Sequence, residues 1–174
     1  MANTSDRYPI GPFEPAKEFD PNQVALHIHT LERLPFKLQQ ATKGLTTLDL
    51  SKTYRAGSWN VRQLIHHIAD SHMNGYIRTK WALSEDNPTI KDYDENGWMK
   101  LGDSDDLPID VSLRLIESLH DRWAYLFRNL DDTQWQRTFI HPEKGDTRTL
   151  YQHAGMYAWH GEHHLAHVRK ALGG

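Results

Sequence analysis

The 174-residue sequence contains no cysteine. Disulfide bonds, cysteine-based zinc ribbons and a cysteine nucleophile are therefore excluded. The sequence also lacks any apolar run approaching the roughly 18 residues that a membrane-spanning helix needs. The formal net charge is -3, and acidic and basic residues are interspersed. The one-sided basic surface typical of nucleic-acid-binding proteins is thus not expected.

Residues 1–20 are rich in proline and glycine and lack the uninterrupted apolar segment of a signal peptide. We expect this segment to run as an extended N-terminal arm. The length of the chain suits one domain covering residues 1–174. These features together predict a cytoplasmic enzyme or binding protein without a membrane or nucleic-acid partner.

Apolar residues recur at helical spacing in four segments, so four helices are expected, at residues 21–43, 60–87, 108–130 and 149–172. Pro35 should kink or split the first of them. A long loop is expected at residues 87–107. Between the third and fourth helices we expect a short helical turn and then a hairpin with its tip at Lys144–Asp146. Four amphipathic helices around one core predict an all-α four-helix bundle.

Histidine is unusually frequent, with twelve residues in the chain and five of them between His153 and His167. Aromatic and aliphatic residues such as Tyr157 and Leu165 are interleaved with these histidines, so they belong to a helix and are not a purification tag. His160 and His164 are four residues apart and therefore lie one turn apart on the same face. This is the ligand spacing of helical zinc sites.

The fourth helix offers other histidines besides this pair. Gly161 stands where the glutamate of an H-E-x-x-H zinc-protease motif would be, so that motif is absent. His163 and His167 are also four residues apart, but helical geometry directs His163 towards water. His153 and His167 lie on the same flank of the helix as His160 and His164, and either could orient a metal ligand through a hydrogen bond.

A catalytic metal site commonly has three protein ligands, so a third must come from another element. The second helix carries His67 and His72, and its apolar residues surround much of its circumference. Helical spacing therefore leaves the choice between these two histidines open.

The chain resembles the YfiT branch of the DinB superfamily, bacterial proteins described as metal-dependent hydrolases and related to bacillithiol S-transferases. The segments that carry the resemblance are Trp59–His72, Tyr157–His164, Tyr8–Gly11, Tyr93–Glu95 with Trp98, and His141–Pro142. They extend over nearly the whole chain and are far more specific than a histidine pair alone.

The resemblance implies that His67, His160 and His164 are the metal ligands, and it decides in favour of His67 over His72. It also implies a DinB-like four-helix bundle, a cytoplasmic location and a homodimer. We expect one divalent metal ion per chain. Zinc is the first expectation, and nickel is compatible with three imidazole ligands.

Three neutral imidazoles leave at least one coordination position open, so the leading hypothesis is a hydrolase that activates water for attack on a small molecule. The alternative is an S-transferase that activates a low-molecular-weight thiol, because a metal ion deprotonates a coordinating thiol. The second alternative is a non-catalytic stress protein that binds its metal structurally.

No general base is identified by the sequence. Helical geometry directs Glu162 away from His160 and His164. Asp70 could orient a ligand or be an ordinary solvated charge. Ser71, Asn74 and Arg78 follow His67 along one strip of the second helix. This strip could line a pocket for a carboxylate-bearing substrate, or it could be a simple polar stripe.

Overall fold

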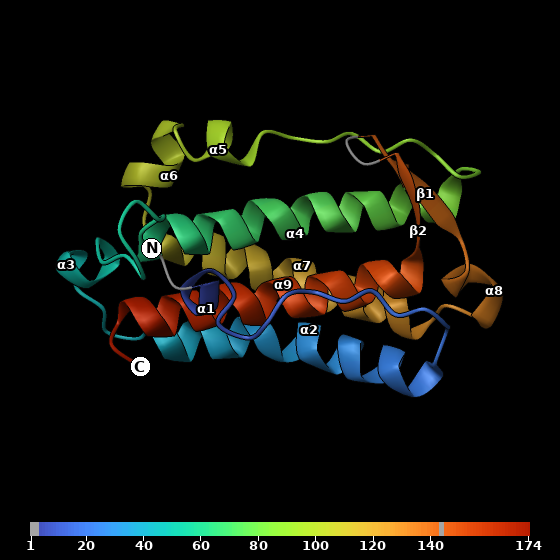
Figure 1. Ribbon diagram of the computed structural model, residues 1–174, viewed down its shortest axis with the longest axis horizontal. Coiled ribbons are helices and arrows are strands. Elements are labelled where there is room, and N and C mark those ends of the chain that lie inside the picture. The colour runs from blue at the N-terminus through green and yellow to red at the C-terminus, as the bar shows by residue number, and fades with distance from the viewer. Residues whose placement is uncertain (1–3, 143–144) are drawn as a thin grey trace.

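The computed structural model describes residues 4–142 and 145–174 (Figure 1). Four long helices dominate it: α2 (Pro21–Thr42), α4 (Val61–Ser84), α7 (Ile109–Arg128) and α9 (Leu150–Ala171). They form the expected four-helix bundle. Within the described ranges, no helix has both the length and the apolar composition that crossing a bilayer requires.

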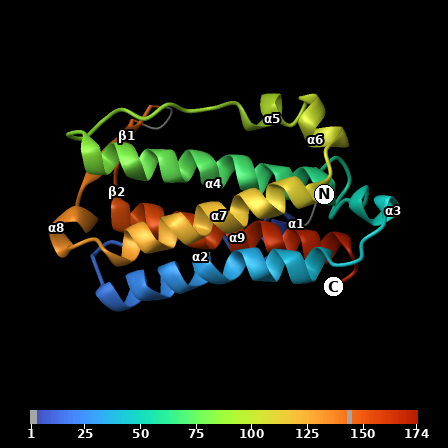
Figure 2. The same cartoon turned by 180° about the vertical axis from the view of Figure 1, so that it is seen from behind.

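The order of the helices includes one long crossover. α2 contacts α7 and α9, and α4 contacts the same two helices. α4 and α7 run in one direction, while α2 and α9 run in the other (Figures 1 and 2). The chain therefore returns along the bundle after α4. This return carries the short helices α5 (Glu95–Trp98) and α6 (Gly102–Asp106), in a region where the sequence predicted only a loop.

Short elements complete the chain: α1 (Thr4–Arg7), α3 (Thr47–Leu50), α8 (Asp132–Trp135), β1 (Thr138–His141) and β2 (Asp146–Thr149). The two strands pair antiparallel, which confirms the hairpin between the third and fourth long helices. Its tip was predicted at Lys144–Asp146, and Lys144 lies outside the described residues. α1 adds a helical turn to the arm that was expected to be extended.

The helix boundaries follow from local capping. The Asn60 side chain accepts from the backbone N–H of Gln63 at the start of α4, and Thr149 does the same for Gln152 at the start of α9. Both pairs form capping boxes, which satisfy N–H groups of the first turn. Pro35 was predicted to kink or split this helix, and the continuous α2 contradicts the split. Burial of residues on both sides of Pro35, including Leu34 and Leu38, holds the helix together there.

The hydrophobic core consists of two clusters at successive levels of the bundle. In α7, one cluster includes Ile109, Leu113 and Ile116, and the other includes Trp123 and Phe127. His120 lies between these two sets in α7. α9 repeats this arrangement, with His160 and His164 placed between Tyr157 of one cluster and Leu165 of the other. Buried imidazoles thus form a polar layer across the middle of the core.

Candidate metal centre

Three histidines from two helices converge in this polar layer. His67 of α4 and His160 and His164 of α9 each offer a ring nitrogen, and these nitrogens lie within 4.8 Å of one another. The Nε2 atoms of His67 and His160 are 3.3 Å apart. Tetrahedral zinc with bonds of about 2.0 Å to nitrogen spaces its ligand atoms roughly 3.3 Å apart. The structure therefore brings the three expected ligands together at a separation that suits one metal ion.

A chain of hydrogen bonds determines the tautomer of His160. His120 Nδ1 donates to the Leu31 carbonyl oxygen at 2.6 Å, because that oxygen can only accept. Neutral His120 then has Nε2 free to accept from His72 Nδ1 at 2.8 Å. His72 Nε2 in turn accepts from His160 Nδ1 at 3.1 Å. The lone pair of His160 therefore resides on Nε2, the atom that faces His67.

Burial keeps these imidazoles neutral. Desolvation lowers the pKa of His67 and His120 to about 4. It lowers the pKa of His72, His160 and His164 well below the ordinary value, and the neighbouring imidazoles add to the effect. Neutral imidazole is the form that binds a metal ion. The protonation state of the cluster thus fits a divalent cation.

The structure also separates the roles of the two histidines that helical spacing left open. His67 faces Nε2 of His160, whereas His72 bonds to Nδ1 on the other side of the same ring. His120 was not among the residues predicted for the site. The signal was present, since His120 continues the spacing of Leu113 and Ile116 on the apolar face of α7. A histidine on such a face requires buried hydrogen-bond partners.

His163 is buried, with 6% of its surface exposed, so the prediction that it faces water is wrong. Its ring stacks on Trp159 with centroids 4.4 Å apart, and Tyr8 lies over it at 5.9 Å. The N-terminal arm covers this side of α9, where Trp159 Nε1 donates to the Gly11 carbonyl oxygen at 3.1 Å. Helical geometry could not show this cover, because it comes from a distant segment.

The remaining two histidines of α9 are also buried. His167 Nδ1 lies 3.5 Å from His164 Nδ1, which places it behind a candidate ligand. His153 Nε2 donates to the Gly75 carbonyl oxygen at 2.9 Å. His153 is therefore tied to the backbone of α4.

A small pocket of about 150 Å³ adjoins His160, and we call it the His160 pocket. Ser71 Oγ lies there, 3.5 Å from His160 Nε2. Arg78 is 8% exposed and is held by the Lys91 carbonyl oxygen at 3.2 Å and by Asp92 at 3.7 Å. The lining residues are Ser71, Arg78, Asp92, Tyr93, Glu95, Phe139, His141, Arg148, His153, Met156, Tyr157 and His160.

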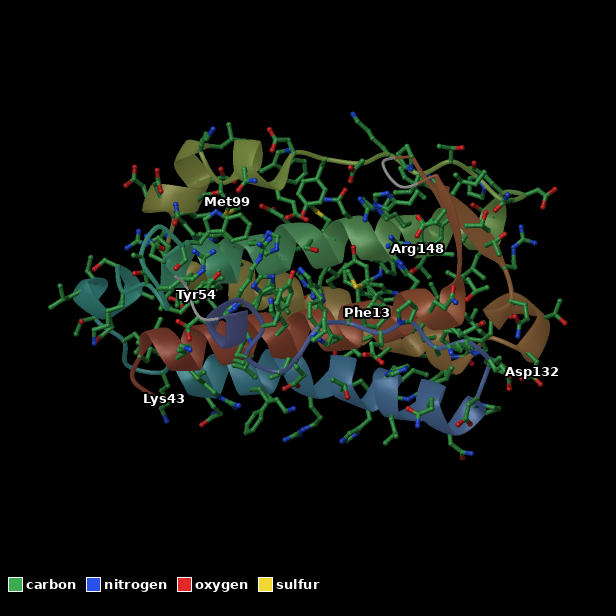
Figure 3. All side chains as sticks on the ribbon, in the orientation of Figure 1. Phe13, Lys43, Tyr54, Met99, Asp132 and Arg148 are labelled. Atoms are coloured by element: carbon green, nitrogen blue, oxygen red, sulfur yellow. The ribbon has the colours of Figure 1, made fainter. Side chains whose placement is uncertain are left out.

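A second pocket, of about 330 Å³, adjoins His164, and we call it the His164 pocket. Its lining residues are Arg7, Tyr8, Tyr54, Arg55, Gly57, Ser58, Trp59, Asn96, His163, His164 and His167. Tyr54 of this pocket and Arg148 of the His160 pocket are labelled in Figure 3 and lie apart along the bundle. The histidine triad therefore has a pocket on each side.

Two acidic residues considered from the sequence lie outside both pockets. Glu162 pairs with Lys37 at 2.6 Å, which agrees with the expectation that it projects away from the triad. Burial and nearby Asp103 raise the pKa of Asp70 to about 6. Asn74 does not line the His160 pocket with Ser71 and Arg78, because its side chain donates to the Asp70 carbonyl oxygen.

The absence of a glutamate after His160 has a packing reason. A Cβ added to Gly161 would collide with the Leu34 side chain, because α9 and α2 approach closely there. A larger residue at this position would force the buried Leu34 side chain or the two helices to shift. In this chain, the position that carries the general base in zinc proteases is therefore occupied by Gly161, which lets α9 and α2 approach closely.

Comparisons with known proteins place the chain among proteins described as metal-dependent. A model of the DinB superfamily matches residues 30–168. A Halalkalibacterium halodurans protein named "Putative metal-dependent hydrolase BH0277" is 53% identical over 96% of both chains. A counterpart from Oceanobacillus iheyensis with the same description is 48% identical over 94% of both.

Solved structures show the same fold. YfiT from Bacillus subtilis, described as "a probable metal-dependent hydrolase with an unusual four-helix bundle topology", superposes with a TM-score of 0.94. It is 43% identical and covers 96% of this chain and 95% of its own. A mycothiol-dependent maleylpyruvate isomerase shares the fold at a TM-score of 0.66 and 15% identity, over 83% of this chain and 60% of its own.

Proposed function

Because the chain belongs to the DinB superfamily, as a YfiT-type protein, we propose that it is a metal-dependent hydrolase of a small molecule. His67, His160 and His164 would hold its single divalent ion. The observation that carries this proposal is the convergence of three neutral imidazoles beside a pocket. Relatives over nearly the whole chain length bear the same description, which supports it further.

When bound, a divalent ion supplies Lewis-acid chemistry that acidifies a water molecule or a thiol. The chain's own residues prepare the site for it. His72 and His120 hold the proton of His160 on Nδ1, so that Nε2 is available as a ligand. Ser71 Oγ adjoins that same Nε2 and can hydrogen-bond a small molecule in the His160 pocket. The size of this pocket suits a molecule of a few heavy atoms.

We propose zinc as the ion, with nickel as the alternative. Three imidazoles suit both, and the general order of affinities does not favour zinc over nickel. A position left open by three protein ligands is typical of catalytic zinc sites. Metal content measured after expression with each metal in controlled supply would decide between them.

Elemental analysis of untagged protein tests the proposal. Wild-type protein should contain about one equivalent of metal, and His67→Ala, His160→Ala and His164→Ala should each lose most of it. His29→Ala is the matched control, because His29 is exposed on α2. Retention of the metal by His160→Ala would overturn the site, and the absence of metal-dependent ester or amide hydrolysis in a broad substrate panel would overturn the reaction class.

Thiol transfer is the second candidate function. It is favoured by the position of the triad between two pockets, since a transferase must bind a thiol and an electrophile together. Incubation with an electrophilic fluorogenic reagent, with and without cellular thiols, separates the two functions. Turnover that depends on the thiol selects the transferase, and hydrolysis without the thiol selects the hydrolase.

The small-molecule substrate and the homodimer remain predictions. Sedimentation velocity of the untagged protein tests the dimer directly. A single species with the mass of one chain across micromolar concentrations would contradict it.

A further inference from the structure

We propose that the His164 pocket binds the carboxylate or phosphate group of a small molecule, with Arg55 as the principal contact and Arg7 as the second. As the anchor for a substrate, this site rests on the proposed function, because the pocket adjoins the candidate ligand His164. Anion binding itself does not require the metal. The inference is carried by the positive charges of the pocket and by its buried nitrogen atoms that lack hydrogen-bond partners, Arg55 Nε–H among them.

The charge of the lining is positive. Arg7 and Arg55 line the pocket, and no carboxylate does so among its described residues. Arg78, Arg128 and Arg148 each pair with a carboxylate, whereas neither Arg7 nor Arg55 takes part in these ion pairs of the described residues. Their charges are therefore free to be matched by a ligand.

Three buried nitrogen atoms in this lining also lack partners. Arg55 Nε, His163 Nδ1 and His167 Nε2 are shielded from solvent and have no hydrogen-bond partner among the described residues. His163 is more than nine-tenths buried. Buried polar groups are almost always hydrogen-bonded, so each such exception requires an explanation. A bound oxygen atom from an anion would satisfy the Arg55 Nε–H, and the guanidinium fork suits carboxylate and phosphate alike.

A second metal ion was weighed as the occupant and is disfavoured. Nitrogens of His163, His164 and His167 also lie within 4.8 Å of one another, so geometry alone would allow a cation. Burial lowers the pKa of His167, and the nearby positive charges of Arg55 and Lys170 lower it further. The same positive field would repel a divalent cation. In addition, the proposed metal site already uses His164.

The two pockets differ in charge, which distinguishes their roles. The His160 pocket contains Arg78 and Arg148 but also Asp92 and Glu95, so its charges are balanced. Only the His164 pocket is one-sidedly positive among its described residues. Trp59 in this pocket lies 4.5 Å from the His67 ring, between centroids. An anion bound there would thus be adjacent to the triad and could hold one end of a substrate.

Titration calorimetry on the full chain, treated with chelator, tests this inference. The probes are inorganic phosphate and succinate, which distinguish the two sources of the oxyanion. Wild-type protein should bind at least one of them, and Arg55→Gln should weaken that binding by about tenfold or more. Arg55→Lys, which keeps the charge but not the fork, should be intermediate. Arg148→Gln is the matched control in the His160 pocket and should bind as wild type.

Three outcomes would overturn the inference: equal binding by Arg55→Gln and wild type, loss of binding in Arg148→Gln instead, or no binding of either probe at millimolar concentration. A second equivalent of zinc in wild type that disappears in His163→Ala would also overturn it, in favour of a cation site. Because these measurements use metal-free protein or metal content alone, they are independent of hydrolase activity. Failure of the metal site itself would appear separately, in His160→Ala.

Discussion

His72 Nε2 lies 3.1 Å from His160 Nδ1, so His72 contacts a candidate ligand on the side opposite to His67. Its own Nδ1 is bound by His120, which is anchored on the Leu31 carbonyl oxygen. A backbone carbonyl of α2 thus determines, through two imidazoles, which nitrogen of His160 is available to a metal ion.

Interrupting the series of hydrogen bonds from Leu31 to His160 should weaken metal binding without removing a metal ligand. His120→Phe removes the acceptor of His72 Nδ1, so the ring of His72 no longer has a preferred tautomer. We expect the zinc affinity to fall about 10- to 100-fold, the range typical of groups that orient ligands. Competition with a chromophoric chelator measures it. His66→Gln is the control. His66 is also buried, but its hydrogen bonds go to Ser112 and Leu107, which are not part of the hydrogen-bond series from Leu31 to His160. An equal loss in both variants would contradict the prediction.

Acid should destabilise the metal-free protein before most carboxylates titrate. Burial lowers the pKa of His153 to about 3 and of His120 to about 4 in the folded protein, whereas the unfolded chain has the ordinary value near 6.5. Between these values the unfolded state binds more protons, so stability falls as the pH falls from 6.5. Each such histidine contributes roughly 1.4 kcal/mol per pH unit to the slope of the unfolding free energy against pH.

Urea unfolding of chelated protein at pH 6.5, 5.5 and 4.5 measures this slope. His153→Gln should lower this slope by the contribution of one histidine. The glutamine amide can still donate to the Gly75 carbonyl oxygen, but it does not titrate. The exposed His29→Gln is the control and should leave the slope unchanged. A flat profile in wild-type protein would refute the expectation.

Gly75 is required by packing against the hydrophobic core cluster that contains Trp123 and Tyr157. A Cβ at this position would lie 2.6 Å from Trp123 Cη2 and would also collide with the Tyr157 ring. Both rings are buried and cannot move aside easily. Gly75→Ala should therefore lower the free energy of unfolding by about 1–3 kcal/mol. Gly102→Ala is the control, because no atom lies within 4 Å of its added Cβ. Equal stability of the two variants would disprove the packing argument.

Removal of the metal should leave the protein folded. The two hydrophobic clusters and the hydrogen bonds from Leu31 to His160 are all made by the chain itself. We expect a cooperative thermal transition in the chelated protein, with a lower midpoint, because a ligand that binds only the folded state stabilises it. Circular dichroism with and without chelator measures this. Unfolding at room temperature on chelation would instead favour the purely structural role of the metal.

Much of the fold could be predicted from local rules. The spacing of residues such as Leu113 and Ile116 located the long helices, and Asn60 and Thr149 marked two of their beginnings correctly. The neighbouring positions of His160 and His164 follow from the helical repeat alone. By contrast, α5 and α6 were missed, because very short helices have too few residues to show a periodic pattern.

The sequence by itself determined the four helices and the adjacent placement of the candidate ligands His160 and His164 on α9, because capping and the 3.6-residue repeat act over a few neighbouring residues. Helical spacing did not separate His67 from His72, for which only the family resemblance favoured His67, and it predicted neither the burial of His163 nor the link from His120 to His160. The tertiary structure decided the contacts of these residues, since each depends on which distant segment packs against the histidine: α9 for His67, the N-terminal arm for His163, and α2 and α4 for His120. Contacts between distant segments leave no periodic signal in the sequence.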